Sequence, residues 1–168
     1  MTELVLFWIF AAAIVVSSAL VIVSRDALHS AMSLVAAFFF LAGEYVLLWA
    51  HTIAVLQVLV YAGAIMVLFL FVIMLLSLTE TALGGGRMSF GRAVGGAASA
   101  ALLVLLVVAI ARMQVPAVTL DAARQATFGT LAHVGEVLYT RWLLPFEAVS
   151  LLLLVAIVGA VVVAKARI

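Results

Sequence analysis

The sequence contains no cysteine and very little charge. Of its 168 residues, 9% are charged and 70% are apolar, whereas soluble domains carry about 25% charged residues. The missing cysteine excludes disulfides and thiolate-held iron–sulfur clusters within this chain. The missing charge excludes a water-soluble surface, because too few polar residues remain to build one. We therefore expect a membrane protein that carries no redox centre of its own.

Sequence patterns for binding nucleotides, metals or nucleic acids are missing as well. No glycine-rich phosphate loop follows a predicted strand, and a net charge of +1 gives no basic surface for nucleic acid. The predicted topology places His29 on the opposite side of the membrane from His51 and His133, so no close pair of metal ligands arises. We expect this chain to bind no cofactor and no metal.

Five charge-free stretches are close to membrane-spanning length. They cover residues 4–24, 27–43, 45–79, 93–111 and 148–164, and a hydrocarbon core of about 30 Å requires about 20 helical residues. The apolar runs are continuous rather than alternating, which favours helices over a barrel. The sequence predicts an all-α, single transmembrane domain over residues 1–168, with helices at about 4–23, 28–50, 53–78, 92–112 and 145–164.

Two connections between these helices are informative. Trp49-Ala50-His51-Thr52 predicts a tight hairpin between the second and third helices, with Thr52 as a helix N-cap. Residues 113–144 are predicted to form an extramembrane loop, in which Ala122 to Ala132 is expected to form a short interfacial helix. The leader Met1-Thr2-Glu3 has no basic region, so we expect the first helix to be retained rather than cleaved as a signal peptide.

The basic residues near the helix ends predict the orientation. One side of the membrane would hold Arg25, Arg87, Arg92, Lys165 and Arg167, and the other would hold Arg112, Arg124 and Arg141 over a longer loop. Basic residues are in excess on the cytoplasmic side of membrane proteins. We therefore expect the N terminus outside and the C terminus in the cytoplasm.

The third helix is the most informative segment. At about 26 residues it would be about 39 Å long as a regular α-helix, so it must tilt, protrude or contain an irregular turn. Gln57 and Tyr61 are four residues apart and are predicted to share one helix face, where a buried phenol requires a hydrogen-bond partner. Gly63, between two alanines, permits either close packing by a neighbouring helix or a π-bulge.

Two carboxylates are predicted inside or beside the spans. Glu44 lies about six residues before the predicted end of the second helix, where a carboxylate is costly unless it is protonated, paired or facing water. Either it relays protons toward a neighbouring subunit, or it reaches the outer interface or meets His51, two turns along the same face. Glu147, after Pro145, is expected in the first turn of the last helix, where it complements the helix dipole.

The organisation of the chain favours a subunit of a larger assembly. No internal repeat of the kind that builds transporters is visible, and 168 residues leave little room for an inverted pair of repeats. A small independent transporter and a structural spacer are the alternatives.

Three blocks resemble subunit J of bacterial NADH-quinone oxidoreductase, or respiratory complex I, whose mitochondrial counterpart is chain 6. They are RDALHSAMSL (Arg25–Leu34), LQVLVYAGAIMVLFLFVIMLL (Leu56–Leu76) and LLPFEAVSLLLLVAIVGA (Leu143–Ala160). The resemblance implies a core membrane-arm subunit of a proton-pumping enzyme in the bacterial inner membrane. NADH, FMN, iron–sulfur clusters and quinone would then be bound by partner subunits, and the neighbours would be the quinone-site subunit and antiporter-like subunits. A ferredoxin- or deazaflavin-fed quinone reductase is the nearest alternative.

The same resemblance assigns roles in the third helix. It implies a π-bulge near Tyr61 to Met66, whose interconversion with regular helix makes or breaks a water path between the quinone-reduction module and the pumping subunits. Tyr61, Gly63 and Met66 would gate that path, with Gln57 as a supporting polar group, and none would be catalytic. His51 stands where the family often has an acidic residue, and Glu44 stands where it has no fixed carboxylate.

Overall fold

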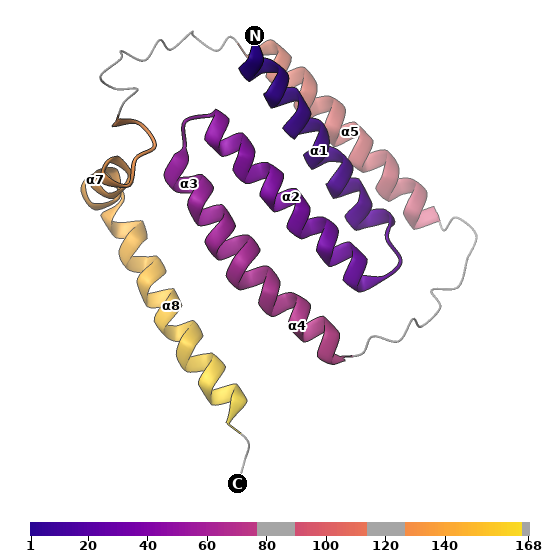
Figure 1. Ribbon diagram of the computed structural model, residues 1–168. Coiled ribbons are helices and arrows are strands. Elements are labelled where there is room, and N and C mark those ends of the chain that lie inside the picture. The colour runs from indigo at the N-terminus through magenta and orange to yellow at the C-terminus, as the bar shows by residue number, and fades with distance from the viewer. Residues whose placement is uncertain (77–89, 114–126, 166–168) are drawn as a thin grey trace.

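The computed structural model describes residues 1–76, 90–113 and 127–165, and every regular element in these residues is a helix (Figure 1). Five helices are long and apolar enough to cross a membrane, which confirms the predicted five-span, all-α architecture. The elements are α1 (Thr2–Val23), α2 (Ala27–Leu47), α3 (His51–Leu56), η1 (Gln57–Ile65), α4 (Met66–Leu76), α5 (Phe90–Arg112), α7 (Leu131–Arg141) and α8 (Leu143–Ala164).

The third predicted helix is one continuous span made of α3, η1 and α4. The spans alternate in direction. We call the end of the molecule that holds the N terminus, the α2–α3 turn and α7 the N-side, and the end that holds the α1–α2 turn and the last residues of α8 the C-side (Figure 1).

The α2–α3 turn corrects two predictions. The second helix ends at Leu47 rather than near residue 50, because Trp49 has a positive φ of 62°, which ends a right-handed helix. The N–H of Ala50 then donates to the carbonyl of Tyr45 and closes the turn. Ala50 is the N-cap of α3, so Thr52 lies within the first turn and does not cap the helix.

The last span also begins earlier than predicted. Helix α8 starts at Leu143, and Pro145 is its third residue, where the missing N–H would be unpaired in any case. Glu147 consequently lies beyond the first turn, which corrects its predicted place. The loop 113–144 contains α7, from Leu131 to Arg141, whereas residues 122–126 of the expected interfacial helix lie outside the described residues.

Helices α1, α2 and the third span pack in that order, and small residues form their core. The buried apolar residues of the described chain are Met66 and five alanines, Ala31, Ala37, Ala42, Ala54 and Ala62. A Cβ on Gly43 of α2 would come within 2.8 Å of the Phe10 ring of α1. In a membrane, small residues of this kind allow neighbouring helix backbones to approach closely.

Helices α5 and α8 contribute nothing to that core. Every side chain that the structure describes in α5, from Val94 onward, is exposed, and so is every side chain of α8. The described chain is therefore a packed unit of three spans with two further spans whose surfaces are free for lipid or other subunits.

Candidate functional site in the third membrane helix

The centre of the third span is a nine-residue π-helix, η1, from Gln57 to Ile65. Its last turn closes where the N–H of Met66 donates to the carbonyl of Tyr61, five residues earlier. The expected bulge near Tyr61 to Met66 therefore overlaps a longer π segment that begins four residues closer to the N-side. The π-helix is rare, occurs mostly as single-turn bulges within α-helices, and is frequently found at functional sites.

The π geometry changes which residues share a face. Gln57, Ala62 and Met66, spaced by five and four residues, are buried at 6%, 5% and 4% exposure. Tyr61 is 49% exposed. Gln57 is buried and Tyr61 is half exposed, but the Tyr61 ring still contacts α2, so the shared face of Gln57 and Tyr61 stays a prediction.

Tyr61 lies against α2 through its ring alone. Its ring meets Phe38 edge to face, with centroids 5.8 Å apart and planes at 63°. Within the described residues, no group hydrogen-bonds its hydroxyl. The hydroxyl is therefore available to water or to a group outside this chain, as a phenol at membrane depth requires.

Gly63 relieves crowding inside the π turn. A Cβ at this position would lie 3.2 Å from the carbonyl oxygen of Val58, five residues earlier. That distance is tighter than ordinary van der Waals contact, so a larger residue disfavours the π conformation locally. The residue is exposed, and no described neighbouring helix packs on it. Among the described residues, a Cβ at Gly63 would therefore crowd its own helix and no neighbouring helix.

Glu44 is buried at 6% exposure, and both of its carboxylate oxygens lack a hydrogen-bond partner among the described residues. It lies three residues before the end of α2 rather than six, because the helix ends at Leu47. The alternatives of reaching the interface or meeting His51 are corrected: Glu44 is inside the fold, and the chain reverses before His51, which is exposed at the start of α3.

An apolar groove of about 510 Å³ runs between α2 and the start of the third span. Its lining includes Phe39, Val46, Val55 and Leu59, with His51 at its N-side end. The lining offers one titratable side chain, so the groove has no constellation for bond chemistry. In the residues that the structure describes, no three His, Cys, Asp or Glu side chains gather as a metal site.

The sequence of this chain matches the model of a protein family. The model for NADH-ubiquinone/plastoquinone oxidoreductase chain 6 matches residues 17–163, which is most of the chain. The chain belongs to the chain 6 family. The three sequence blocks that carry the resemblance lie between residue 25 and residue 160. All three fall within the matched region, which confirms the resemblance.

Named relatives of this chain 6 protein come from several enzymes. NADH-quinone oxidoreductase subunit J of Rhodobacter capsulatus is 35% identical, covering 92% of this chain and 78% of the relative. Subunit 10 of the Thermus thermophilus enzyme is 40% identical, covering 88% and 81%. F(420)H(2) dehydrogenase subunit J of Methanosarcina mazei is 32% identical, covering 97% and 91%.

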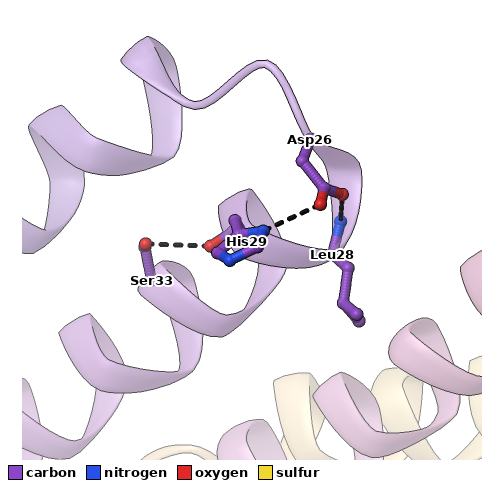
Figure 2. Close-up of polar contacts among 4 residues, drawn as sticks. All are labelled: Asp26, Leu28, His29 and Ser33. Atoms are coloured by element: carbon purple, nitrogen blue, oxygen red, sulfur yellow. Dashed lines mark hydrogen bonds and ion pairs between the residues drawn. The ribbon is translucent and has the colours of Figure 1, made fainter. Parts of the chain in front are cut away.

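In this chain 6 protein, the first of the three blocks builds the α1–α2 turn (Figure 2). Asp26 is the N-cap of α2: one carboxylate oxygen accepts the Leu28 N–H at 2.8 Å, and the other accepts His29 Nδ1–H at 2.8 Å. The hydrogen bond from His29, and then that from Leu28, hold the pKa of Asp26 below its ordinary value of 3.8. Ser33 donates to the His29 carbonyl at 2.9 Å.

The sequence analysis assigned no role to Asp26, which is the N-cap of α2. The signal was present, because an Asp directly before an apolar run is an N-terminal helix signature. Ser30 strengthens the turn by donating to the carbonyl of Val21 in α1 at 2.7 Å.

Proposed function

We propose that this chain is a core membrane-arm subunit of a proton-pumping NADH:quinone oxidoreductase, in which η1 couples quinone reduction to proton translocation. The observation that carries the proposal is the nine-residue π segment from Gln57 to Ile65 at the centre of the longest span. A segment of this kind converts to regular α-helix by exchanging hydrogen-bond partners within the chain. Such an exchange moves side chains without breaking the span.

In this proposal the chain gates a water path and does no bond chemistry. Tyr61, within η1, offers a hydroxyl that has no hydrogen-bond partner among the described residues, and Gly63 keeps the π conformation accessible. Met66 and Gln57 lie on the buried face, which the conversion would turn. Glu44 belongs to the proposal as a proton-carrying carboxyl, since buried carboxyls within membranes are costly and mark proton paths.

The wider assembly supplies what this chain lacks. NADH, FMN, the iron–sulfur clusters and quinone would be bound by partner subunits, and the quinone-site and antiporter-like subunits would cover exposed surfaces such as those of α5 and α8. The excess of basic residues at the C-side supports a bacterial inner-membrane orientation with the N-side outside.

A second electron donor is the specific alternative. The relative from Methanosarcina mazei is named a subunit of F(420)H(2) dehydrogenase, so a deazaflavin- or ferredoxin-fed quinone reductase would accept the same membrane subunit. Mass spectrometry of the proteins that copurify in mild detergent distinguishes the two, because a NADH-binding flavoprotein is expected only with the first.

Gly63→Ala tests the gating role. The added Cβ meets the Val58 carbonyl and favours regular helix over π. We expect unchanged assembly but a lower ratio of protons pumped to electrons transferred in proteoliposomes. Gly159→Ala in α8 is the matched control, because its Cβ would meet nothing within 4 Å. An unchanged ratio in Gly63→Ala would remove the gating role.

Tyr61→Phe tests the hydroxyl separately. The change removes one oxygen and keeps the ring contact with Phe38. We expect coupling to weaken while the amount of assembled complex stays constant. Loss of assembly with normal coupling in the remainder would instead assign Tyr61 a packing role.

A further inference from the structure

The N-side end of the third span is held by a residue far away in the sequence. Thr52 donates two hydrogen bonds to the carbonyl oxygen of Gly129, from its N–H at 3.0 Å and from its hydroxyl at 2.7 Å. The two residues are 77 positions apart. We call this pair, together with Trp49, the N-side clamp.

The clamp requires two unusual backbone conformations. Gly129 has a φ of 72° and Trp49 a φ of 62°, both in the left-handed region. A Cβ on Gly129 would overlap the carbonyl oxygen of Trp49. For a residue other than glycine the left-handed region is uncommon and unfavourable, so the contact depends on glycine at position 129.

The segment that carries Gly129 is itself anchored. Thr130 is the N-cap of α7 and accepts the His133 N–H at 3.3 Å. At its other end α7 joins α8 with one residue between them, and Tyr139 packs edge to face on Phe146 at 5.2 Å. Helix α7 is seen nearly end-on where α8 runs across the view, so α7 lies crosswise to a membrane span (Figure 1).

Helix α7 has the residue distribution of an interfacial helix. At helical spacing, Leu131, Val134 and Leu138 fall on one side, and His133, Glu136 and Thr140 fall on the opposite side. A helix of this kind rests at the membrane surface with its apolar side in the lipid. The clamp therefore fixes the start of the third span to a surface element that is continuous with another span.

Among the residues that the structure describes, the C-side half of the third span packs against α2 but makes no hydrogen bond to a distant segment. In α4, Met66 is the one buried residue, and most of the side chains from Val67 to Leu76 are exposed. When a π turn converts to an α turn, that turn holds one residue fewer. The helix that follows then rotates by about 100° and shifts by about 1.5 Å relative to the preceding part. One end must take up that motion, and the end that has no hydrogen bond to a distant described segment takes it up more readily.

We propose that Thr52 and Gly129 are positioning residues that hold the N-side end of the third span, so that conversion of η1 moves α4 and leaves α3 in place. This inference rests on the proposed function, in which η1 converts during turnover. It adds the direction of the motion and the residues that set it.

Spin labels at the two ends of the span test the direction. This cysteine-free chain accepts single cysteines at exposed positions, Ile53→Cys in α3 and Leu75→Cys in α4. In the assembled complex, addition of NADH and a short-chain ubiquinone should change the spectrum of the Leu75 label and leave that of the Ile53 label unchanged. The same labelling reaction on a complex that contains the unmodified chain gives the background signal from cysteines in partner subunits, and this signal is subtracted.

Removing the Thr52 hydroxyl tests the clamp itself. Thr52→Val keeps the N–H donor and the volume, so the fold is expected to survive, while amide exchange in α3 accelerates about five-fold, the equivalent of one hydrogen bond of about 1 kcal/mol. The Ile53 label should then respond to turnover, and Thr52→Ser should restore the original behaviour. If Thr52 had a structural role alone, Thr52→Val would slow assembly, and the Ile53 label would still not respond to turnover.

The outcomes separate this inference from the proposed function. A turnover response at Ile53 in the otherwise unmodified chain overturns the clamp and leaves gating by η1 intact. No response at either label overturns both. A response at Leu75 that Thr52→Val leaves unchanged shows that α4 moves for a reason other than the clamp, which also overturns the inference.

Discussion

The two ends of α2 are closed by turns of similar length that are built in different ways. At the C-side, Asp26, His29 and Ser30 close the turn with bonds to atoms at most nine residues away. At the N-side, the turn that contains Trp49 is completed by Gly129, from the loop before α7. Both turns have local hydrogen bonds, including that from the Ala50 N–H to the Tyr45 carbonyl, but the N-side turn is in addition joined to a segment far away in the sequence.

The difference matters because the third span starts at the N-side turn. A local cap stabilises its own helix whatever the remainder of the chain does. A clamp between distant segments instead transmits position, since moving the loop before α7 moves Thr52 with it. The N-side turn is therefore the point at which the segment before α7 can act on the start of the third span.

Gly129→Ala should have the largest effect on this comparison. Alanine in the left-handed region costs about 1–2 kcal/mol, and moving its Cβ away from Trp49 breaks two hydrogen bonds of about 1 kcal/mol each. We expect about 3 kcal/mol of destabilisation, seen as a lower midpoint of thermal unfolding of the purified complex.

Gly135→Ala is the matched control for that change. Gly135 lies within α7, and its Cβ would meet nothing within 4 Å. Alanine is favoured over glycine in helices by about 1 kcal/mol, so this variant should be slightly more stable than the original chain. Equal effects of the two substitutions would show that the clamp contributes nothing.

The same contrast explains what could be predicted from the sequence. The five spans follow from apolar runs, and an irregular turn in the third follows from its length. The Asp26 cap could have been found, because all its atoms lie within four residues. The Thr52–Gly129 contact could not, since a backbone carbonyl leaves no side-chain signature in the sequence. The length of η1 could not be predicted either, because the same types of residue form π turns and α turns.

Glu44→Leu should have the next largest effect, and it should be stabilising. Glu44 lies just before the N-side turn with both carboxylate oxygens unpaired among the described residues. Replacing an unsatisfied buried polar group by an apolar one recovers about 1–3 kcal/mol. We expect a higher midpoint of thermal unfolding for the purified complex.

Glu44→Gln completes that experiment, because it keeps the shape and removes the titratable proton. Loss of proton pumping in both variants, with electron transfer retained, supports a proton-carrying role. A lower midpoint in Glu44→Leu would reveal a polar partner for the carboxyl in the assembled complex, and the N-side end of α2 would then be as fully bonded as the C-side end.

Asp26→Ala should have a smaller, local effect at the C-side turn. It removes the acceptor for the Leu28 N–H and for His29. Loss of an N-cap side chain frays the first turn of a helix. We expect roughly five-fold faster amide exchange at the start of α2, with exchange in α3 unchanged. Faster exchange in α3 as well would show that the two turns are coupled. The C-side turn would then not be purely local.

The smallest expected effect is a dependence on pH that belongs to the C-side turn alone. Hydrogen bonds from His29 and Leu28 hold the pKa of Asp26 below 3.8 in the folded chain. A lowered carboxyl pKa contributes stability that is fully present above the unfolded pKa and is lost as pH falls through the folded pKa. Asn does not titrate, and its amide nitrogen replaces the oxygen that accepts from His29. The original chain should therefore have a higher thermal midpoint than Asp26→Asn at neutral pH, and the difference should shrink as pH falls below about pH 4. A difference that stays the same down to about pH 3 would show that the Asp26 charge contributes no stability.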